Sequence, residues 1–198
     1  MPTPRPAQVT DVRRRGLRVY LRAPRRADAG PFLAAVRASQ RLHGHWVQPP
    51  STAAGFATYV GRFARGARDP LRSTHVGFVV CRVDDDALVG VLNFSEIVRG
   101  AFQCAYLGYY AFAPHAGDGY MAEGLDLALD TAFRRLKLHR IEVNVQPTNA
   151  RSLALVRRAG FRREGYSPRY VKLAGRWRDH VRLALTVEDW RAQRSARR

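Results

Sequence analysis

The sequence is poor in acidic residues and in cysteine, and it contains no long apolar run. Its 16 Asp and Glu side chains stand against 34 Lys and Arg, which gives a formal net charge of +18 at pH 7. The two cysteines, Cys81 and Cys104, each lie in an apolar, strand-like stretch. This excludes a disulfide-stabilised scaffold and favours two reduced core thiols. No stretch reaches the roughly 18 apolar residues that a membrane-spanning helix needs.

The two ends of the chain differ in composition from the middle. Residues 1–16 are rich in proline and arginine and lack the apolar segment of a secretory signal. We therefore expect a flexible basic arm over 1–16, one domain over 17–192 and a frayed end over 193–198. We also expect a soluble, cytoplasmic protein without membrane association. His43 and His45 have no further ligands nearby in the sequence, so we expect no metal site.

The excess of positive charge has two interpretations, and composition alone does not decide between them. A charge of this size attracts polyanions, such as ribosomal RNA and phosphorylated cofactors. The other reading is a solvated, arginine-rich surface without a partner. Charge speaks to association and not to fold, so both readings stay open at this point.

Hydrophobic periodicity predicts one mixed α/β domain, in which a mostly antiparallel sheet of about seven strands is flanked by about four helices. Three consecutive strand patterns, separated by turns at Asp84–Asp86 and Arg99–Gly100, indicate an antiparallel meander. The strands are expected over 17–22, 73–83, 87–97, 102–113, 140–146, 161–173 and 180–187. The helices are expected from Asp28 to Leu42, around Phe56–Phe63, over 119–136 and over 149–160.

A glycine-rich turn, Gly117-Asp118-Gly119, separates the third meander strand from an amphipathic helix. Glycine lets backbone approach a ligand closely, and the amides at a helix start attract anions. A Walker-type phosphate loop is excluded because no lysine follows Gly119. A dinucleotide fingerprint would use Gly117, Gly119 and Ala122, but the antiparallel strands before the turn argue against it. A plain turn before a packed helix remains the other alternative.

The turn resembles the acyl-coenzyme A binding motif of the GNAT family of N-acetyltransferases. In that motif, backbone amides at the helix start hold the pyrophosphate of coenzyme A. Alanine stands at position 116 in place of the usual Arg or Gln, and methionine stands at 121 in place of a small residue. The resemblance implies that the cofactor-binding turn comprises Ala116, Gly117, Asp118, Gly119, Tyr120 and Met121.

The second half of the chain carries a more specific resemblance. The stretch "NVQPTNARSLALVRRAGFRREGY" is similar to the GNAT branch that acetylates the N-termini of ribosomal proteins. The resemblance implies that Asn149 contacts the pantetheine region and that Ser152 assists the leaving thiolate. Other family members place a tyrosine seven residues after this asparagine, where this chain has Val156. Arg157 is a candidate contact to the 3′-phosphate, and Asn149 is also a typical helix N-cap.

The implied chemistry needs few side chains. A neutral amine attacks a thioester carbonyl, and an amide near Tyr110, Ala111 or Phe112 is expected to stabilise the developing oxyanion. A terminal α-amine has a pKa of about 7.7–8.0, so a weak base or water suffices, whereas a lysine at about 10.4 needs a stronger base. The candidate bases are Glu96, Tyr106, Glu142 and Tyr170, of which we select Glu96 and Tyr106 with Ser152 as catalytic residues.

Together, these expectations describe an enzyme that uses acetyl-coenzyme A, without a metal, to acetylate the N-terminal α-amine of a ribosomal protein. The expected N-terminal residue is alanine. The partner is then a ribosomal protein or particle, with electrostatic contact to ribosomal RNA, and the enzyme is a monomer or homodimer. Two alternatives remain: an acyltransferase for a small amine or a protein lysine, and a non-catalytic protein that binds ribosomes or nucleic acid.

Overall fold

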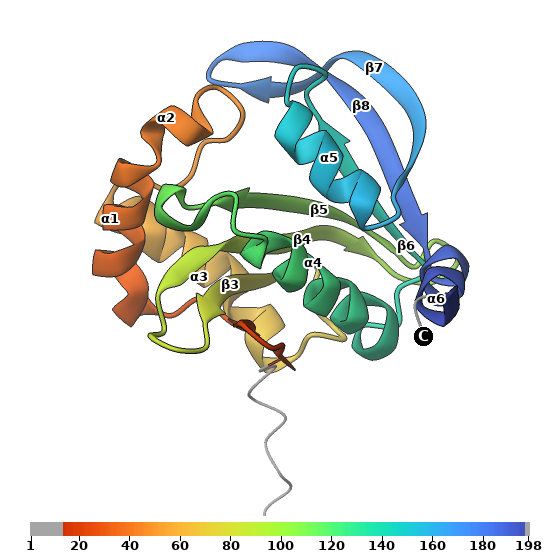
Figure 1. Cartoon of the computed structure of the whole chain (residues 1–198), viewed down its shortest axis with the longest axis horizontal. Coiled ribbons are helices and arrows are strands. Elements are labelled where there is room, and N and C mark those ends of the chain that lie inside the picture. Colours follow the sequence, from red (N-terminus) through yellow and green to blue (C-terminus); the bar gives the residue numbers. More distant parts are fainter. Residues whose placement is uncertain (1–13, 197–198) are drawn as a thin grey trace, which may run out of the picture.

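Seven strand-like stretches and one additional two-residue segment pair into a single sheet in the computed structural model, which describes residues 14–196 (Figure 1). The strand order across the sheet is β1-β2-β3-β4-β5-β6-β8-β7, and every neighbouring pair is antiparallel except β5 and β6. The strands are β1 (Arg14–Arg15), β2 (Val19–Arg22), β3 (Val76–Arg82), β4 (Leu88–Val98), β5 (Cys104–Ala111), β6 (Arg140–Val145), β7 (Arg162–Leu173) and β8 (Arg176–Thr186).

Helices cover both faces of this sheet. Figure 1 shows α4 and α5 in front of the strands and α3 behind them. The α-helices are α1 (Ala29–Ala38), α2 (Gln40–His43), α3 (Ala53–Arg68), α4 (Tyr120–Asp130), α5 (Ala150–Arg158) and α6 (Val187–Ala196), and the shorter turns are η1 (Arg26–Asp28), η2 (Ala113–His115) and the π-helical η3 (Thr131–Arg135). No helix within residues 14–196 is both long and apolar enough to cross a membrane.

Alternation along the strands creates two cores, one on each face. On the face of α4 to α6, the core is formed by residues such as Leu92, Leu125 and Ile141. On the face of α1 and α3, Phe32, Phe56 and neighbouring aromatic rings pack against β3 and β4. Both faces of the central strands are therefore buried, and this buried sheet fixes the positions of the segments that follow β5 and β6.

The predicted α/β class and the mostly antiparallel sheet are confirmed. β3, β4 and β5 form the expected meander, and β7 and β8 form the expected final antiparallel pair. The turn at Gly175 is left-handed, with φ of 76°, a conformation that glycine adopts without strain. The sheet has one strand more than expected, because Arg14 and Arg15 pair with β2 as β1. The rest of the predicted arm, residues 1–13, lies outside the described residues.

The C-terminal end of the chain was predicted wrongly in part. Residues 193–196, expected to be frayed, continue α6, whereas residues 197 and 198 lie outside the described range. The sequence of α6 is mostly polar, and Trp190 is its buried anchor, 5.2 Å from the Phe133 ring centroid. This low apolar content explains why periodicity did not reveal the helix. The one-turn helix α2 was also not predicted as a separate element, since Ser39 divides it from α1.

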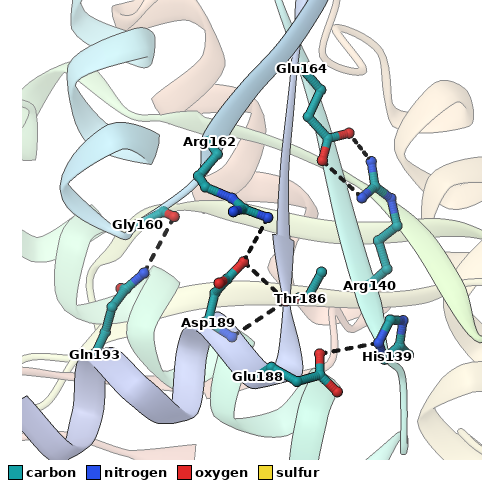
Figure 2. A network of polar contacts seen from close by, with 9 residues as sticks. All are labelled: His139, Arg140, Gly160, Arg162, Glu164, Thr186, Glu188, Asp189 and Gln193. Atoms are coloured by element: carbon teal, nitrogen blue, oxygen red, sulfur yellow. Dashed lines mark hydrogen bonds and ion pairs between the residues drawn. The ribbon is translucent and has the colours of Figure 1, made fainter.

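Side-chain bonds hold α6 against the sheet (Figure 2). Asp189 accepts a hydrogen bond from Thr186 at 3.0 Å and forms an ion pair with Arg162 at 3.1 Å. Gln193 donates to the carbonyl of Gly160, where α5 ends, at 3.4 Å. The same view shows Arg140 of β6 paired with Glu164 of β7. These contacts tie β6, β7 and the end of α5 into one unit.

Candidate active site

The glycine turn forms a helix start without a side-chain cap. Gly119 is the N-cap of α4, with φ of 81°, and Gly117 has φ of 109°. Both values lie in the region that favours glycine, and a side chain at position 117 would point into open space. The first amides of a helix have no acceptor within the helix. Together with the helix dipole, they make this turn suitable for an anion such as a pyrophosphate.

Arg18 braces this turn from outside, a contribution that sequence analysis did not identify. Its guanidinium donates to the carbonyl of Asp118 at 3.0 Å and lies 4.9 Å from the centroid of the Tyr120 ring. It also pairs with Glu123 at 3.2 Å, and the Arg18 amide donates to the same carboxylate at 2.8 Å. Burial alone would raise the pKa of Glu123, but the hydrogen bonds from Arg18 and Val19 lower it below its ordinary value.

Residue 116, where the family motif has Arg or Gln, holds an alanine whose amide donates to the Ala113 carbonyl at 3.2 Å. The Arg18 guanidinium lies beside the turn, where it donates to the Asp118 carbonyl and pairs with Glu123. Because Arg18 precedes the turn by 100 residues, only the fold reveals this neighbour.

The parallel contact between β5 and β6 is short, and it ends in the middle of β5. Pairing runs only from Cys104 to Tyr106 on β5, opposite Arg140 to Glu142 on β6. β5 then continues to Ala111 alongside β4 alone, while β6 continues to Val145 alongside β8. The edge of β5 that faces away from β4 therefore pairs with none of the described strands over its last five residues, and we call it the open edge.

Alternation of the ladder decides which amides face this edge. The Phe112 amide donates to the Val89 carbonyl of β4 at 2.7 Å, so Tyr110, two residues earlier, also directs its amide toward β4. Of the three expected oxyanion donors, only the Ala111 amide points to the open edge. The Tyr109 amide points there as well, and sequence analysis did not select it. Phe112 itself is fully buried in the aromatic core.

The short helix α2 covers the end of this edge. His43 donates from Nε2 to the Ala111 carbonyl at 2.8 Å, and its ring lies edge-on to the Tyr110 ring at 5.2 Å. Burial lowers the pKa of His43, so the imidazole is neutral at neutral pH. Among the described residues, no three His, Cys, Asp or Glu side chains gather to hold a metal ion. The role of His43 in this structure is a hydrogen bond to β5.

Helix α5 begins with a side-chain cap beside the same edge. Asn149 Oδ1 accepts from the Ser152 amide at 3.1 Å, which is the expected N-cap bond. The Ser152 hydroxyl lies 2.5 Å from the Tyr109 hydroxyl of β5. Val156, one turn later, is fully buried in the core. Arg157 is exposed on the outer face of α5, as expected for a basic residue at a helix end.

The selected bases lie on neighbouring strands, away from α5. Glu96 sits at a bulge of β4 with φ of 48°, its side chain is 69% exposed, and it lies 3.7 Å from His75. Tyr106 follows in the register of β5 opposite Ser95. A hydrogen bond with Tyr170, and then burial, raise the pKa of Tyr106 to about 12. The Tyr106 phenol is thus protonated at neutral pH and can hold an amine by hydrogen bonding, but it is a poor base.

Two candidate bases remain: Tyr170, which bonds Tyr106, and Glu142, which is ion-paired with Arg140. Arg140 Nε lies 2.7 Å from the Glu142 carboxylate, and the same guanidinium binds Glu164. Glu142 lies in the register of β6 opposite Tyr106, at the last paired position before the strands separate. Its carboxylate therefore places negative charge near Tyr106, where the pairing of β5 with β6 ends.

Comparisons with known proteins identify relatives of this chain. The family model described as "Acetyltransferase (GNAT) domain" matches residues 18–162. A [Ribosomal protein uS5]-alanine N-acetyltransferase from Escherichia coli is 45% identical over 107 residues, which is 54% of this chain and 55% of that protein. A probable N-acetyltransferase, YjcK, from Bacillus subtilis is 42% identical over 112 residues, 57% of this chain and 62% of that protein.

Among solved structures, RimJ of Mycobacterium smegmatis in complex with CoA-disulfide has a TM-score of 0.77 and 30% identity. The match covers 86% of this chain and 82% of that one. The chain spans less than two thirds of the length of the two curated relatives above. The structural match is wider, since it extends over most of the sheet and its helices.

Proposed function

The chain belongs to the GNAT family of acetyltransferases, and we propose that it acetylates an amine directly from acetyl-coenzyme A. The observation that carries this proposal is the open edge of β5, flanked by the uncapped start of α4 and by Asn149 and Ser152 at the start of α5. Backbone donors, space at the glycine turn and side-chain donors beside one strand edge fit a long, phosphorylated thioester.

Different residues beside β5 would bind different parts of acetyl-coenzyme A. The amides at positions 119–121 would hold the pyrophosphate, with Arg18 beside them. The Asn149 capping bond uses Oδ1, so the Nδ2 group can still donate to the pantetheine part. Arg157 is the candidate for the 3′-phosphate. The bound cosubstrate supplies an acetyl group activated as a thioester.

Three kinds of group in the chain would assist the transfer of the acetyl group. The Ala111 and Tyr109 amides point to the open edge and can donate to the carbonyl oxygen as negative charge develops there. The Ser152 hydroxyl can donate to the departing sulfur. An α-amine with a pKa of about 7.7–8.0 has an appreciable neutral fraction at pH 7 and can lose its second proton to water or to the exposed Glu96 carboxylate.

We propose further that the acceptor is the N-terminal α-amine of a ribosomal protein, with alanine the preferred residue, and that the reaction takes place in the cytoplasm. The named E. coli relative supports this choice, and so does the raised pKa of Tyr106, which makes this phenol a poor base. The net charge of +18 would favour binding to ribosomal particles over binding of cationic polyamines. Salt-dependent co-sedimentation with ribosomal subunits tests the contact with ribosomal RNA.

A panel of acceptors tests the function. The protein is incubated with acetyl-coenzyme A and with peptides that begin with Ala, Ser or Met, a peptide whose only free amine is a lysine, and spermidine. Thiol release gives the rate, and mass spectrometry locates the acetyl group. The proposal expects α-acetylation of the Ala peptide. Exclusive reaction of spermidine or lysine would support the small-amine or lysine alternative, and coenzyme A binding without any turnover would support the non-catalytic one.

A further inference from the structure

The contact between Tyr109 and Ser152 joins two elements that lie far apart in the sequence. The Tyr109 hydroxyl lies 2.5 Å from Ser152 Oγ and 3.2 Å from the Ser152 carbonyl oxygen. Tyr109 is on β5, at the edge that β6 leaves open, and Ser152 is in the first turn of α5. The capping bond of Asn149 fixes the Ser152 backbone. The position of the serine hydroxyl is therefore defined from both sides.

The count of protons limits what this contact can do. Each hydroxyl has one proton, and a carbonyl oxygen can only accept. If the phenol donates to the Ser152 carbonyl, the serine proton must point to the phenol oxygen and is unavailable to a ligand. If the phenol donates to Ser152 Oγ, the serine proton is free to point away from Tyr109. The two hydroxyls thus have two hydrogen-bonding arrangements. In the second one, the Ser152 hydroxyl can donate to a ligand at the open edge.

We propose that Tyr109 is a positioning residue that holds the Ser152 hydroxyl so that its proton points to the sulfur of the leaving thiolate. This inference rests on the proposed acetyl transfer. A strand residue thus places a phenol beside Ser152, whereas the helix position seven residues after Asn149 is occupied by the buried Val156. β5 then contributes both the Tyr109 amide and, through Ser152, a hydrogen bond to the sulfur.

The acidity of the groups shows why Tyr109 positions and does not protonate. Burial raises the pKa of Tyr109 to about 12 despite its hydrogen bond with Ser152, and a thiol has a pKa near 8.5. Net transfer of the phenol proton to the thiolate is therefore unfavourable. In the balanced reaction, the C–N bond forms, the C–S bond breaks, and the proton lost by the amine ends on the thiol. Ser152 and Tyr109 keep their protons throughout.

The Tyr109→Phe variant removes the hydroxyl and keeps the ring. We expect kcat for acetyl transfer to fall about fivefold to tenfold, as for one lost hydrogen bond, with little change in the KM for acetyl-coenzyme A. Tyr20→Phe is the matched control, because Tyr20 donates to Asp86 at 2.6 Å and burial also raises its pKa to about 12, but it lies on β2. Tyr20→Phe should lower the unfolding midpoint without lowering kcat.

The double variant with Ser152→Ala separates positioning from simple packing. If Tyr109 acts through Ser152, Tyr109→Phe should have no further effect on kcat in the Ser152→Ala background. An unchanged kcat for Tyr109→Phe, or effects of the two substitutions that multiply, would overturn the inference. The proposed acetyl transfer is tested separately, since it fails only if the wild-type protein acetylates no amine.

A second variant covers the case in which Tyr109→Phe does not fold. A ring-difluorinated tyrosine at position 109 keeps the size and the hydroxyl but makes the phenol more acidic. Once this phenol ionises, it can no longer donate to Ser152, so kcat should fall on the alkaline side of the pH profile, earlier than in the wild type. Superimposable pH profiles would contradict a positioning role.

Discussion

The starts of α4 and α5 lie beside the same strand edge, but they are built in opposite ways. α4 begins at a left-handed glycine with no side-chain cap, whereas α5 begins at an asparagine whose side chain caps the helix and is followed by a serine. The first arrangement leaves backbone amides for a ligand, and the second presents side-chain groups. The difference teaches that one helix start is suited to hold charge and the other to assist bond cleavage.

The largest effect is expected at the start of α5. Ser152→Ala removes the proposed donor to the sulfur, and loss of one such donor typically lowers kcat about 100-fold. The KM for acetyl-coenzyme A should stay within about twofold, because the uncapped start of α4 is intact. Steady-state kinetics with the best peptide of the panel measures both constants. Ser195→Ala, a serine in α6, is the control. A change confined to KM would remove the proposed division between the helices.

The next effect is expected at the start of α4. Gly119→Ala places a side chain at φ of 81°, which costs roughly 1–2 kcal/mol, and it displaces the amides from the ligand. We expect about tenfold weaker binding of coenzyme A, measured by calorimetry, with kcat nearly unchanged at saturation. Gly100→Ala is matched, since Gly100 has φ of 70° in the turn between β4 and β5. Equal losses of affinity in both variants would mean that strain alone is responsible.

Substitutions of Asn149 test whether its side chain both caps α5 and binds coenzyme A. Asn149→Ala should lower the free energy of unfolding by about 1 kcal/mol through loss of the cap. Asn149→Asp keeps an acceptor for the Ser152 amide but loses the Nδ2 donor, so stability should be retained while coenzyme A binds a few-fold more weakly. Denaturant unfolding and calorimetry of both variants provide the comparison. Full affinity in the Asp variant would restrict Asn149 to capping.

The smallest effect is expected at the contact between Arg18 and Glu123 beside the start of α4. The pKa of Glu123 is lower in the folded state than in the unfolded state, so its contribution to stability is present above the unfolded value of about 4.3 and is lost as pH falls through the folded value. Glu123→Gln should therefore be less stable than the wild type at pH 7, by roughly 1 kcal/mol, and the difference between the two proteins should be smaller at pH 3. Urea midpoints at the two pH values check this. A difference of the same size at pH 3 would exclude the ionic contribution.

Local signals in the sequence were sufficient for much of the fold. Strand alternation, the turns at Gly100 and Gly175 and the Asn149 cap are encoded by neighbouring residues, and the structure contains them. The bulge that gives Glu96 a positive φ and the helix around Trp190 were not predictable, because each depends on packing against distant elements.

Motifs in the sequence indicate parts of the candidate site but not their arrangement. The glycine turn and Ser152 follow from motifs and stay predictions, whereas Arg18 and Tyr109 join the candidate site only because the fold brings them near it. Alternation of the ladder turns the amides of Tyr110 and Phe112 toward β4, which no local sequence pattern reveals. Such choices require the register of the sheet, which periodicity does not supply.

The separation of β5 from β6 after three paired residues has a kinetic consequence. Neighbouring ladders hold both strands on their far sides, so the diverging ends of β5 and β6 are fixed by the sheet. In the proposed reaction, donor and acceptor would meet beside these strands in a ternary complex. Initial-rate plots at several fixed donor concentrations should accordingly give intersecting lines and not parallel ones.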